Sequence, residues 1–485
     1  MKNFLAPPPH RGQLPEKQID SAYKRLRWQV FLGAFVGYAA YYLVRKNLAL
    51  AAPDMIAPAE AGGLGYTKAQ IGIAMSALSI AYAFSKFIMG SLSDRSDARK
   101  FMVVGLLLAA GVMLATGLLP FVTASLAWLF VFMFLAGWIS GMGWPPCGRI
   151  MAHWFSHSER SFKMSIWNCS HTLGSGLLGN FAIFGVVLIG GWFSVTLSGG
   201  ETVLQSWRAV FVFPAMVAVV LAMFCWWALR DTPQSCGLPP VAEWRNDPSP
   251  VKEKAGEENK IPVARLFVDY IFKNRILWMI ALANAFVYFV RYGVGDWSAT
   301  YLRETGILDA DGSKLAFALH NYAGIPGTIL CGLISAKWFK GRCAPANVVY
   351  MLMVVGTVLI YWQATPIASW MAPFFGSTME SVRVGLVYFA LIAVGFCIYG
   401  PVALVSVQAI NLVPKNAAGT AAGFVGLFGY LIGTSLLSGI VIGYVADSSW
   451  GWNATFWLLI ISGILATLLC ASTWRSEKLI CETKK

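Results

Sequence analysis

The sequence predicts an all-α membrane protein of twelve transmembrane helices, arranged as two pseudo-symmetric six-helix bundles. Of its 485 residues, 57% are hydrophobic and only 12% are charged, whereas soluble domains carry about 25% charged residues. Apolar runs of about 20 residues, the length that crosses a bilayer, recur along the chain. A Tyr-x-x-Arg motif in the first run returns in the seventh, as two repeated halves would produce.

The apolar runs set the expected spans and the expected domains. We place the spans at 29–52, 70–92, 101–120, 125–148, 163–192, 208–229, 276–302, 314–336, 346–366, 384–411, 416–446 and 452–474. The expected domains are an N-terminal segment 1–28, a bundle 29–229, a polar linker 230–275, a second bundle 276–474 and a tail 475–485. The linker is expected to join the two halves.

Positive charge is distributed unevenly between the two sides of these spans. If both termini are cytoplasmic, 28 of the 37 Lys and Arg residues lie in inner segments and five in outer segments. This asymmetry is typical of the positive-inside rule and predicts cytoplasmic termini. The net charge of +14 is therefore explained by topology. The lipid bilayer is an expected partner, and nucleic acid is not.

The four remaining cations lie inside the predicted spans. They are Arg45, Lys46, Lys86 and Arg291, and Asp296 is the single acidic residue placed clearly inside a span. Because a charge in low dielectric is costly without a partner, a ligand is expected to supply the missing negative charge. The sequence therefore predicts that an anion binds within the membrane.

Two of these cations have matching surroundings. Tyr42 precedes Arg45 by three residues, and Tyr288 precedes Arg291 by three, so each pair is expected to share a helix face. Both arginines stand about 25 Å above the predicted inner ends of their helices. Because the guanidinium donates two parallel hydrogen bonds, two arginines can clamp a phosphate dianion. The alternative is that each arginine snorkels to a membrane surface.

Lys86 and His171 are further candidates for contact with the anion. Both are expected about 12 Å above the inner ends of their helices, and Lys86 follows Tyr82 by four residues on one stripe. Lys86 could instead snorkel inward. His171 could instead be a core histidine bonded to a backbone carbonyl.

Several motifs resemble the major facilitator superfamily and, within it, the organophosphate:phosphate antiporters over almost the whole chain. The loop GSLSDRSDARK (90–100) is similar to the inner-loop signature of the superfamily, and a degraded copy spans Gly332 to Arg342. More specific segments resemble the bacterial glycerol-3-phosphate/phosphate antiporters: GYAAYYLVRKN (37–47), SKFIMGSLSDRS (85–96), GMGWPPCGR (141–149), RDTPQSCGLPP (230–240) and AAGTAAGFVGLFGYL (417–431).

This resemblance implies roles for particular residues. Arg45 and Arg291 are expected to hold the phosphate, in a site lined by Lys86, His171, Tyr38, Tyr42, Tyr82, Tyr288, Tyr399 and Tyr430. A conformational role is implied for the loop residues Gly90, Asp94, Arg95 and Arg99. One position departs from the family pattern, because Asn321 is neutral where an acidic residue is often found.

Lys46 and Asp296 are the candidates for a gate. Asp296 lies five residues outward of Arg291, which puts it at roughly the height of Lys46 in the other half. We expect the two to pair when the carrier faces inward and to separate when it opens outward. The alternative is two solvated ends that never meet.

The expected function is exchange of a small phosphate ester, glycerol-3-phosphate by preference, for inorganic phosphate across a bacterial inner membrane. The absence of a mid-membrane carboxylate favours exchange over proton symport. The alternatives are a hexose-phosphate antiporter and a transporter-like sensor of sugar phosphate. The chain is not expected to be an enzyme, to bind a metal through His153 and His157, or to need a cofactor. It is expected to act as a monomer.

Overall fold

A computed structural model describes residues 4–197, 200–246, 272–412 and 418–483. Helices dominate it, and ten of them in the described chain are long and apolar enough to cross a membrane: Ala98–Leu118, Leu126–Trp154, Lys163–Trp192, Ser206–Ala228, Arg275–Glu304, Ala310–Lys337, Cys343–Trp362, Met379–Asn411, Ala421–Asp447 and Gly451–Lys478. These ten correspond to predicted spans three to twelve. The protein is therefore a multi-pass membrane protein of the predicted all-helical class.

The first two predicted spans are not among these ten, and the first of them differs in form from the prediction. Span 29–52 is not one helix, because α1 (Glu16–Leu43) ends and α2 (Asn47–Ile56) begins after a three-residue break. Span 70–92 is α3 (Lys68–Asp94). The helix α1 also begins well before the predicted span, so part of the predicted segment 1–28 is helical.

The chain forms two compact units. The first contains the described residues up to Asn47, Ala81–Phe193 and the described chain from Ser206 onward to residue 246; the second contains Leu48–Ile80, the described residues of Ser194–Gln205 and the described chain after residue 271. The helix α3 thus contributes to both. Most of the predicted linker, residues 247–271, lies outside the described residues. The division into two six-helix halves at the linker stays a prediction.

The first unit is built from α1 and from the helices that follow α3. These are α4 (Ala98–Leu118), α5 (Pro120–Ala124), α6 (Leu126–Ser140), α7 (Trp144–Trp154), α8 (His157–Ile189), α9 (Ala209–Ala228) and α10 (Val241–Trp244). The helix α1 packs against α8 and α9, and α4 packs against α6 and α9. Gly174 allows α8 to approach α1 closely, because a Cβ there would lie 2.2 Å from the carbonyl oxygen of Ala39.

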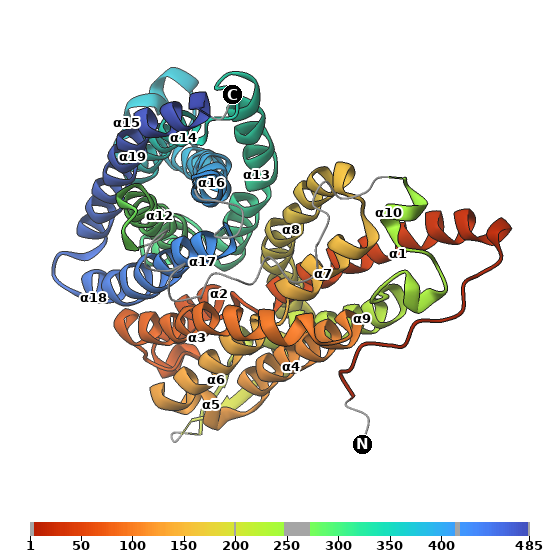
Figure 1. Cartoon of the computed structure of the whole chain (residues 1–485). Coiled ribbons are helices and arrows are strands. Elements are labelled where there is room, and N and C mark those ends of the chain that lie inside the picture. Colours follow the sequence, from red (N-terminus) through yellow and green to blue (C-terminus); the bar gives the residue numbers. More distant parts are fainter. Residues whose placement is uncertain (1–3, 198–199, 247–271, 413–417, 484–485) are drawn as a thin grey trace. The chain divides into compact units, whose positions relative to one another are not determined.

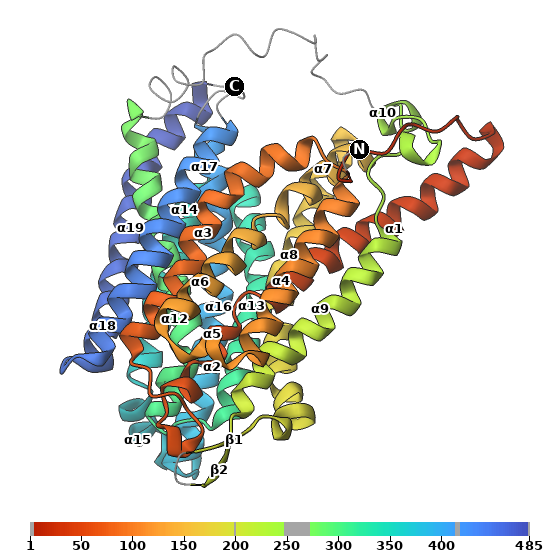
Figure 2. The ribbon, with the colours of Figure 1, turned by 90° about the horizontal axis from the view of Figure 1, so that it is seen from below.

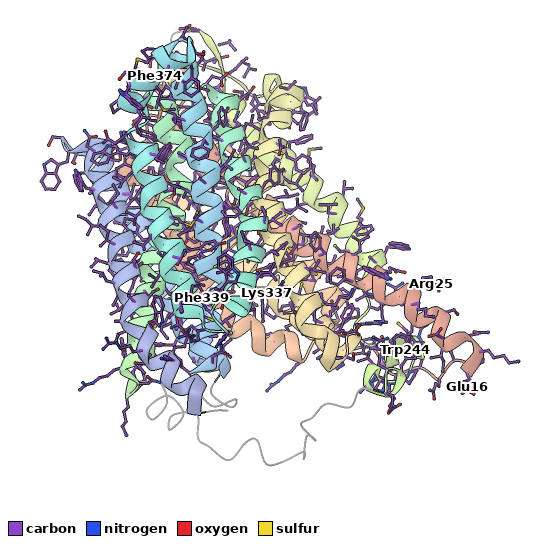
Figure 3. All side chains as sticks on the ribbon, turned by 90° about the horizontal axis from the view of Figure 1, so that it is seen from above. Glu16, Arg25, Trp244, Lys337, Phe339 and Phe374 are labelled. Atoms are coloured by element: carbon purple, nitrogen blue, oxygen red, sulfur yellow. The ribbon has the colours of Figure 1, made fainter. Side chains whose placement is uncertain are left out.

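Aromatic contacts hold α10 on the N-terminal part of α1. Tyr23 of α1 stacks on Trp244 with ring centroids 4.2 Å apart, and its hydroxyl donates to the carbonyl of Pro239 at 2.7 Å. Figure 3 shows Trp244 beside the stretch of α1 between Glu16 and Arg25. The start of the linker region is therefore packed onto the first helix.

Besides most of α2 and the start of α3, the second unit contains the helices after the linker region, several of which run side by side in Figure 2. They are α12 (Arg275–Glu304), α13 (Ala310–Lys337), α14 (Cys343–Trp362), α15 (Ala364–Phe375), α16 (Met379–Asn411), α17 (Ala418–Phe428), the π-helical segment η7 (Gly429–Val441), α18 (Ile442–Asp447) and α19 (Gly451–Thr483). The helix α16 packs against both α13 and α14, and α12 packs against α19 and η7 (Figure 1). The predicted tail 475–485 continues α19 as far as Thr483.

Two features are absent from the sequence prediction. The short strands β1 (Ser194–Thr196) and β2 (Thr202–Leu204) form an antiparallel hairpin in the second unit, with Val195 opposite Val203. The predicted span 416–446 is also not a regular α-helix, because the 13 residues Gly429–Val441 within it are π-helical. Eight cysteines are described, none of them in a disulfide, and six of them are buried.

Candidate anion-binding residues and their surroundings

Arg45 lies in the break between α1 and α2. Its side chain is only 5% exposed. Its Nη1 donates to the hydroxyl of Tyr42 at 3.3 Å, and its Cζ lies 5.2 Å from the ring centroid of Tyr42 and 3.8 Å from that of Tyr82. The predicted shared helix face is not formed, because α1 ends at Leu43, but the side chains of Tyr42 and Arg45 still meet at the helix end.

Asn47 explains why the helix can break there. Its side-chain amide donates to the carbonyl of Leu43 at 3.0 Å and to the carbonyl of Val210 on α9 at 2.9 Å. A helix end leaves backbone carbonyls without their usual partners, and a nearby amide can satisfy them. Asn47 is fully buried, so these two bonds fix the break in place.

Aromatic rings connect the other predicted residues of the first unit. Tyr38 lies 5.5 Å from Tyr42 and stacks on Trp167 at 4.7 Å, measured between ring centroids. The His171 ring lies 5.5 Å from Tyr42, and its Nδ1 is hydrogen-bonded to the carbonyl of Asn168. His171 therefore makes the backbone contact of the alternative interpretation and also borders the tyrosines around Arg45.

Lys86 is placed differently from the arginines. Its side chain is exposed, and its Nζ lies 5.7 Å from the ring centroid of Trp144. Trp144 in turn lies 6.5 Å from Trp167. Lys86 is thus connected to Tyr38 through Trp144 and Trp167, which were not among the predicted site residues.

The second unit places a comparable cluster around Arg291. This residue is 7% exposed and lies within the unbroken helix α12. Its Cζ lies 4.4 Å from the ring centroid of Tyr399, 4.9 Å from that of Tyr292 and 5.9 Å from that of Tyr288. The Tyr430 ring, at the start of η7, lies 5.2 Å from Tyr288. All the predicted residues of this unit therefore gather, and Tyr292 joins them.

The arrangement suits an anion in both units. A guanidinium over a tyrosine ring gains about 0.5–2 kcal/mol from the ring while keeping its N–H groups available in the ring plane. Tyrosine hydroxyls can also donate to an oxyanion. Among the described residues, no group of three or more His, Cys, Asp or Glu side chains is placed to hold a metal.

The predicted gate residues belong to different units. Lys46 is half-buried in the break beside Arg45, in the first unit, and Asp296 is 7% exposed on α12, in the second. The structure describes each residue within its own unit. Their pairing remains a prediction.

The predicted conformational loop joins α3 to α4. Gly90 lies in α3 with open space beside it, and Arg95 is exposed just after the helix ends. The guanidinium of Arg99 lies 4.6 Å from the ring centroid of Trp226 on α9. The side chain of Asp94 lies outside the described part of the structure.

Two further carboxylates organise this loop. Asp97 caps α4 by accepting from the backbone N–H groups of Arg99 and Lys100. Asp231 accepts from the backbone N–H of Ala98 at 3.0 Å and pairs with both Nε and Nη2 of Arg149 at 3.0 and 3.1 Å. The motifs that end at Arg149 and begin at Arg230 are therefore joined to the loop by hydrogen bonds that their spacing in sequence does not reveal.

Comparison with known proteins shows which family the chain belongs to. Residues 31–438 match the family model described as Major Facilitator Superfamily. The chain belongs to the Major Facilitator Superfamily. It is therefore a transporter and not an enzyme, as the sequence predicts. The inner-loop signature and its degraded copy are consistent with membership of this superfamily.

Relatives within the superfamily align over nearly their full length. The chain is 45% identical to the glycerol-3-phosphate transporter of Bacillus subtilis (strain 168), covering 99% of both chains. It is 44% identical to the glycerol-3-phosphate transporter of Haemophilus influenzae, covering 95% of this chain and 94% of the relative. It is 33% identical to a probable hexose phosphate transport protein of Chlamydia pneumoniae, covering 98% and 97%.

Solved structures of the superfamily share the fold. A bacterial homologue of the human lysosomal transporter Spinster, described as inward-facing and unoccupied, superposes with a TM-score of 0.70 at 17% identity. The match covers 93% of this chain and 98% of the other. At this identity the similarity supports the major facilitator fold alone.

Proposed function

We propose that this transporter exchanges glycerol-3-phosphate for inorganic phosphate, and that Arg45 and Arg291 both bind the phosphate group. The observation that carries the proposal is the presence of one buried arginine against tyrosine rings in each unit. A phosphate dianion matches two guanidinium groups in charge and in hydrogen-bonding geometry. The similarity to two glycerol-3-phosphate transporters supports the choice of ester.

A single chain supplies both arginines, so we propose a functional monomer. We also propose that it lies in a bacterial inner membrane with both termini cytoplasmic, because 28 of 37 basic residues then lie on the inner side. Labelling of a cysteine introduced at Ser377, an exposed residue after α15, tests the orientation. A membrane-impermeant reagent added to intact cells should reach it, and labelling only after lysis would reverse the proposed orientation.

Counterflow in proteoliposomes tests the exchange. Purified protein is reconstituted with internal inorganic phosphate, and uptake of labelled phosphate or labelled glycerol-3-phosphate is measured. Uptake should require internal phosphate and should persist when ionophores remove the proton gradient. Uptake into liposomes without internal phosphate, or uptake abolished by the ionophores, would contradict exchange.

A second candidate is a hexose-phosphate carrier, because the chain is also 33% identical to a probable hexose phosphate transport protein. The same vesicles distinguish the two. Unlabelled glycerol-3-phosphate should compete with labelled phosphate at lower concentration than glucose-6-phosphate does. Stronger competition by glucose-6-phosphate would favour the second candidate, and glycerol without phosphate should not compete in either case.

A further inference from the structure

The helices α13 and α16 are joined by three contacts close to the tyrosines around Arg291. Leu391, Gly395 and Tyr399 lie one turn apart on α16 and contact two consecutive residues of α13, His320 and Asn321. The ring Nδ1 of His320 lies 3.0 Å from the carbonyl oxygen of Leu391. A Cβ at Gly395 would lie 1.9 Å from the carbonyl oxygen of His320, so only glycine permits this spacing. The third contact is the one that reaches the anion site.

That contact is a hydrogen bond between two buried side chains. The hydroxyl of Tyr399 donates to Oδ1 of Asn321 at 2.6 Å, and Nδ2 of Asn321 donates to the carbonyl of Phe317 at 2.8 Å. The second bond fixes which end of the amide faces Tyr399, because a carbonyl can accept only from the NH₂ end. Asn321 thus presents its oxygen to the phenol, and it is 4% exposed.

The position of Tyr399 matters because its ring lies against the Arg291 guanidinium. Among the tyrosines of this unit that lie against Arg291, its ring centroid is nearest to Cζ, at 4.4 Å. With its hydroxyl held in this bond, Tyr399 cannot swing to another χ1 rotamer without breaking the bond. The hydrogen bond therefore keeps the ring beside the Arg291 guanidinium.

We propose that Asn321 is a positioning residue for the anion site, acting through Tyr399 to hold the Arg291 guanidinium in its binding orientation. The proposal rests on the proposed function. The neutral amide accepts the phenol hydrogen without adding negative charge near Arg291, whereas a carboxylate in its place would attract the arginine and oppose a bound anion. Asn321 therefore combines the geometric role with a favourable charge.

A double-mutant cycle tests this positioning role. The variants Asn321→Ala, Tyr399→Phe and their combination are compared with wild type in phosphate counterflow, and both KM and the maximal rate are measured. Each single change removes the same hydrogen bond, so KM for phosphate should rise roughly 3- to 10-fold in each. The maximal rate should stay within about twofold of wild type. Because the residues act as one unit, the double variant should have the KM of the worse single variant.

The matched control is Thr328→Ala, two turns further along α13. The Thr328 hydroxyl donates to the carbonyl of Gly324 in its own helix at 2.8 Å and makes no contact with the tyrosine cluster in the described contacts. Its KM should equal that of wild type. Thermal unfolding of each purified variant shows whether it folds, and if Asn321→Ala does not, Tyr399→Phe removes the same bond from the other side.

Several outcomes would overturn the proposal. They are an unchanged KM in Asn321→Ala or Tyr399→Phe, KM costs that add in the double variant, and a lower maximal rate at unchanged KM, which indicates a purely structural role. Failure of the proposed function is seen separately, because wild-type protein would then show no phosphate counterflow, and the positioning role would fall with it.

Discussion

Arg45 and Arg291 each lie against tyrosine rings, and the shape of the cation decides what such a site can hold. A planar guanidinium can rest on a ring and still direct two N–H groups at one phosphate, whereas an ammonium is a point charge without that fork. If Arg45 and Arg291 bind phosphate as proposed, these two positions should require arginine and not only a positive charge.

Replacing either arginine with lysine should reduce phosphate exchange at least about tenfold, which corresponds to about 1.4 kcal/mol. Initial rates of counterflow in proteoliposomes measure the change. The matched control is Arg383→Lys, because Arg383 forms an ion pair with the exposed Glu380 one turn away and is expected to tolerate lysine. Wild-type exchange by Arg45→Lys and Arg291→Lys would return both residues to the snorkelling interpretation.

The sequence predicts equivalent positions for these arginines, and the structure shows why the equivalence is incomplete. Tyr288 and Arg291 share a face of the unbroken α12, as the i, i+3 spacing predicts. The first copy lies at a helix end whose cause is Asn47, bonded to a carbonyl of α9 more than 160 residues away. The segment YYLVRKN contains no Gly or Pro to signal that break, so only the tertiary contact reveals it.

The free backbone N–H groups at helix starts in this protein often donate hydrogen bonds to carboxylates, as at the start of α4. Asp97 accepts two backbone N–H groups at the start of α4 and is 1% exposed. Burial, and then the nearby carboxylate of Asp231, raise the pKa of Asp97 above its usual range. The folded protein therefore binds a proton at Asp97 more tightly than the unfolded chain does.

The sign of this shift predicts how stability depends on pH. A raised pKa in the folded state means that stability falls as pH rises through the folded pKa, starting from about pH 4. Asp97→Asn keeps the capping oxygen but cannot ionise, so its unfolding temperature should match wild type at low pH and exceed it near pH 7. Asp97→Ala loses the cap and should be less stable than Asp97→Asn by about 1 kcal/mol at every pH. A pH-independent difference between wild type and Asp97→Asn would contradict the assignment.

The start of α3 carries a second carboxylate cap, supplied from a distant helix. Asp447, the last residue of α18, accepts from the backbone N–H groups of Lys68 and Ala69 at 3.1 and 2.7 Å. The Lys68 ammonium also lies 2.7 Å from Glu304 at the end of α12. A negative charge at a helix N-terminus is favourable by itself, and here it also joins the start of α3 to α18 within the second unit.

Asp447→Ala should loosen the start of α3 by about 1 kcal/mol. A cysteine placed at the buried position Ala69 should then be alkylated roughly fivefold faster than in the Ala69→Cys parent, since that difference in opening free energy changes the open population by such a factor. The control is Asp311→Asn, whose partner Lys314 lies one turn away and whose own side chain is 53% exposed. Equal alkylation rates in the Asp447 variant and its parent would show that the cap does not hold α3.

On the scale of the whole molecule, hydropathy predicts spans well because the bilayer sets their length. All ten helices of spanning length lie where apolar runs occur. The hairpin of β1 and β2 and the π-helical η7 were not predictable, because neither has a length or polarity pattern of its own within the surrounding sequence. The residues around the two arginines divide in the same way. Tyr399 and Tyr430 were predicted from the resemblance. Tyr292 and Trp167 were not predicted, because helix packing places them there.

The predicted gate involves both units, because Lys46 lies in the first and Asp296 in the second. If they pair in one state of the transport cycle, Lys46→Asp should slow exchange at least about threefold, and adding Asp296→Lys should restore part of it. Counterflow rates and cysteine labelling from the proposed outer side measure the effect of Lys46→Asp and its partial reversal by Asp296→Lys. A double variant no better than the sum of its single changes would exclude the pair.

The thiols of this protein favour such labelling experiments. Of the eight described cysteines, Cys147, Cys225, Cys331, Cys343, Cys397 and Cys470 are buried. A maleimide dye or spin label added to the native protein would therefore meet a largely silent background. Replacing Cys169 and Cys236, together with Cys481, whose side chain lies outside the described structure, leaves a chain in which one introduced thiol reports on one position. The burial of the native thiols thus makes the transport cycle of this carrier accessible to site-specific spectroscopy.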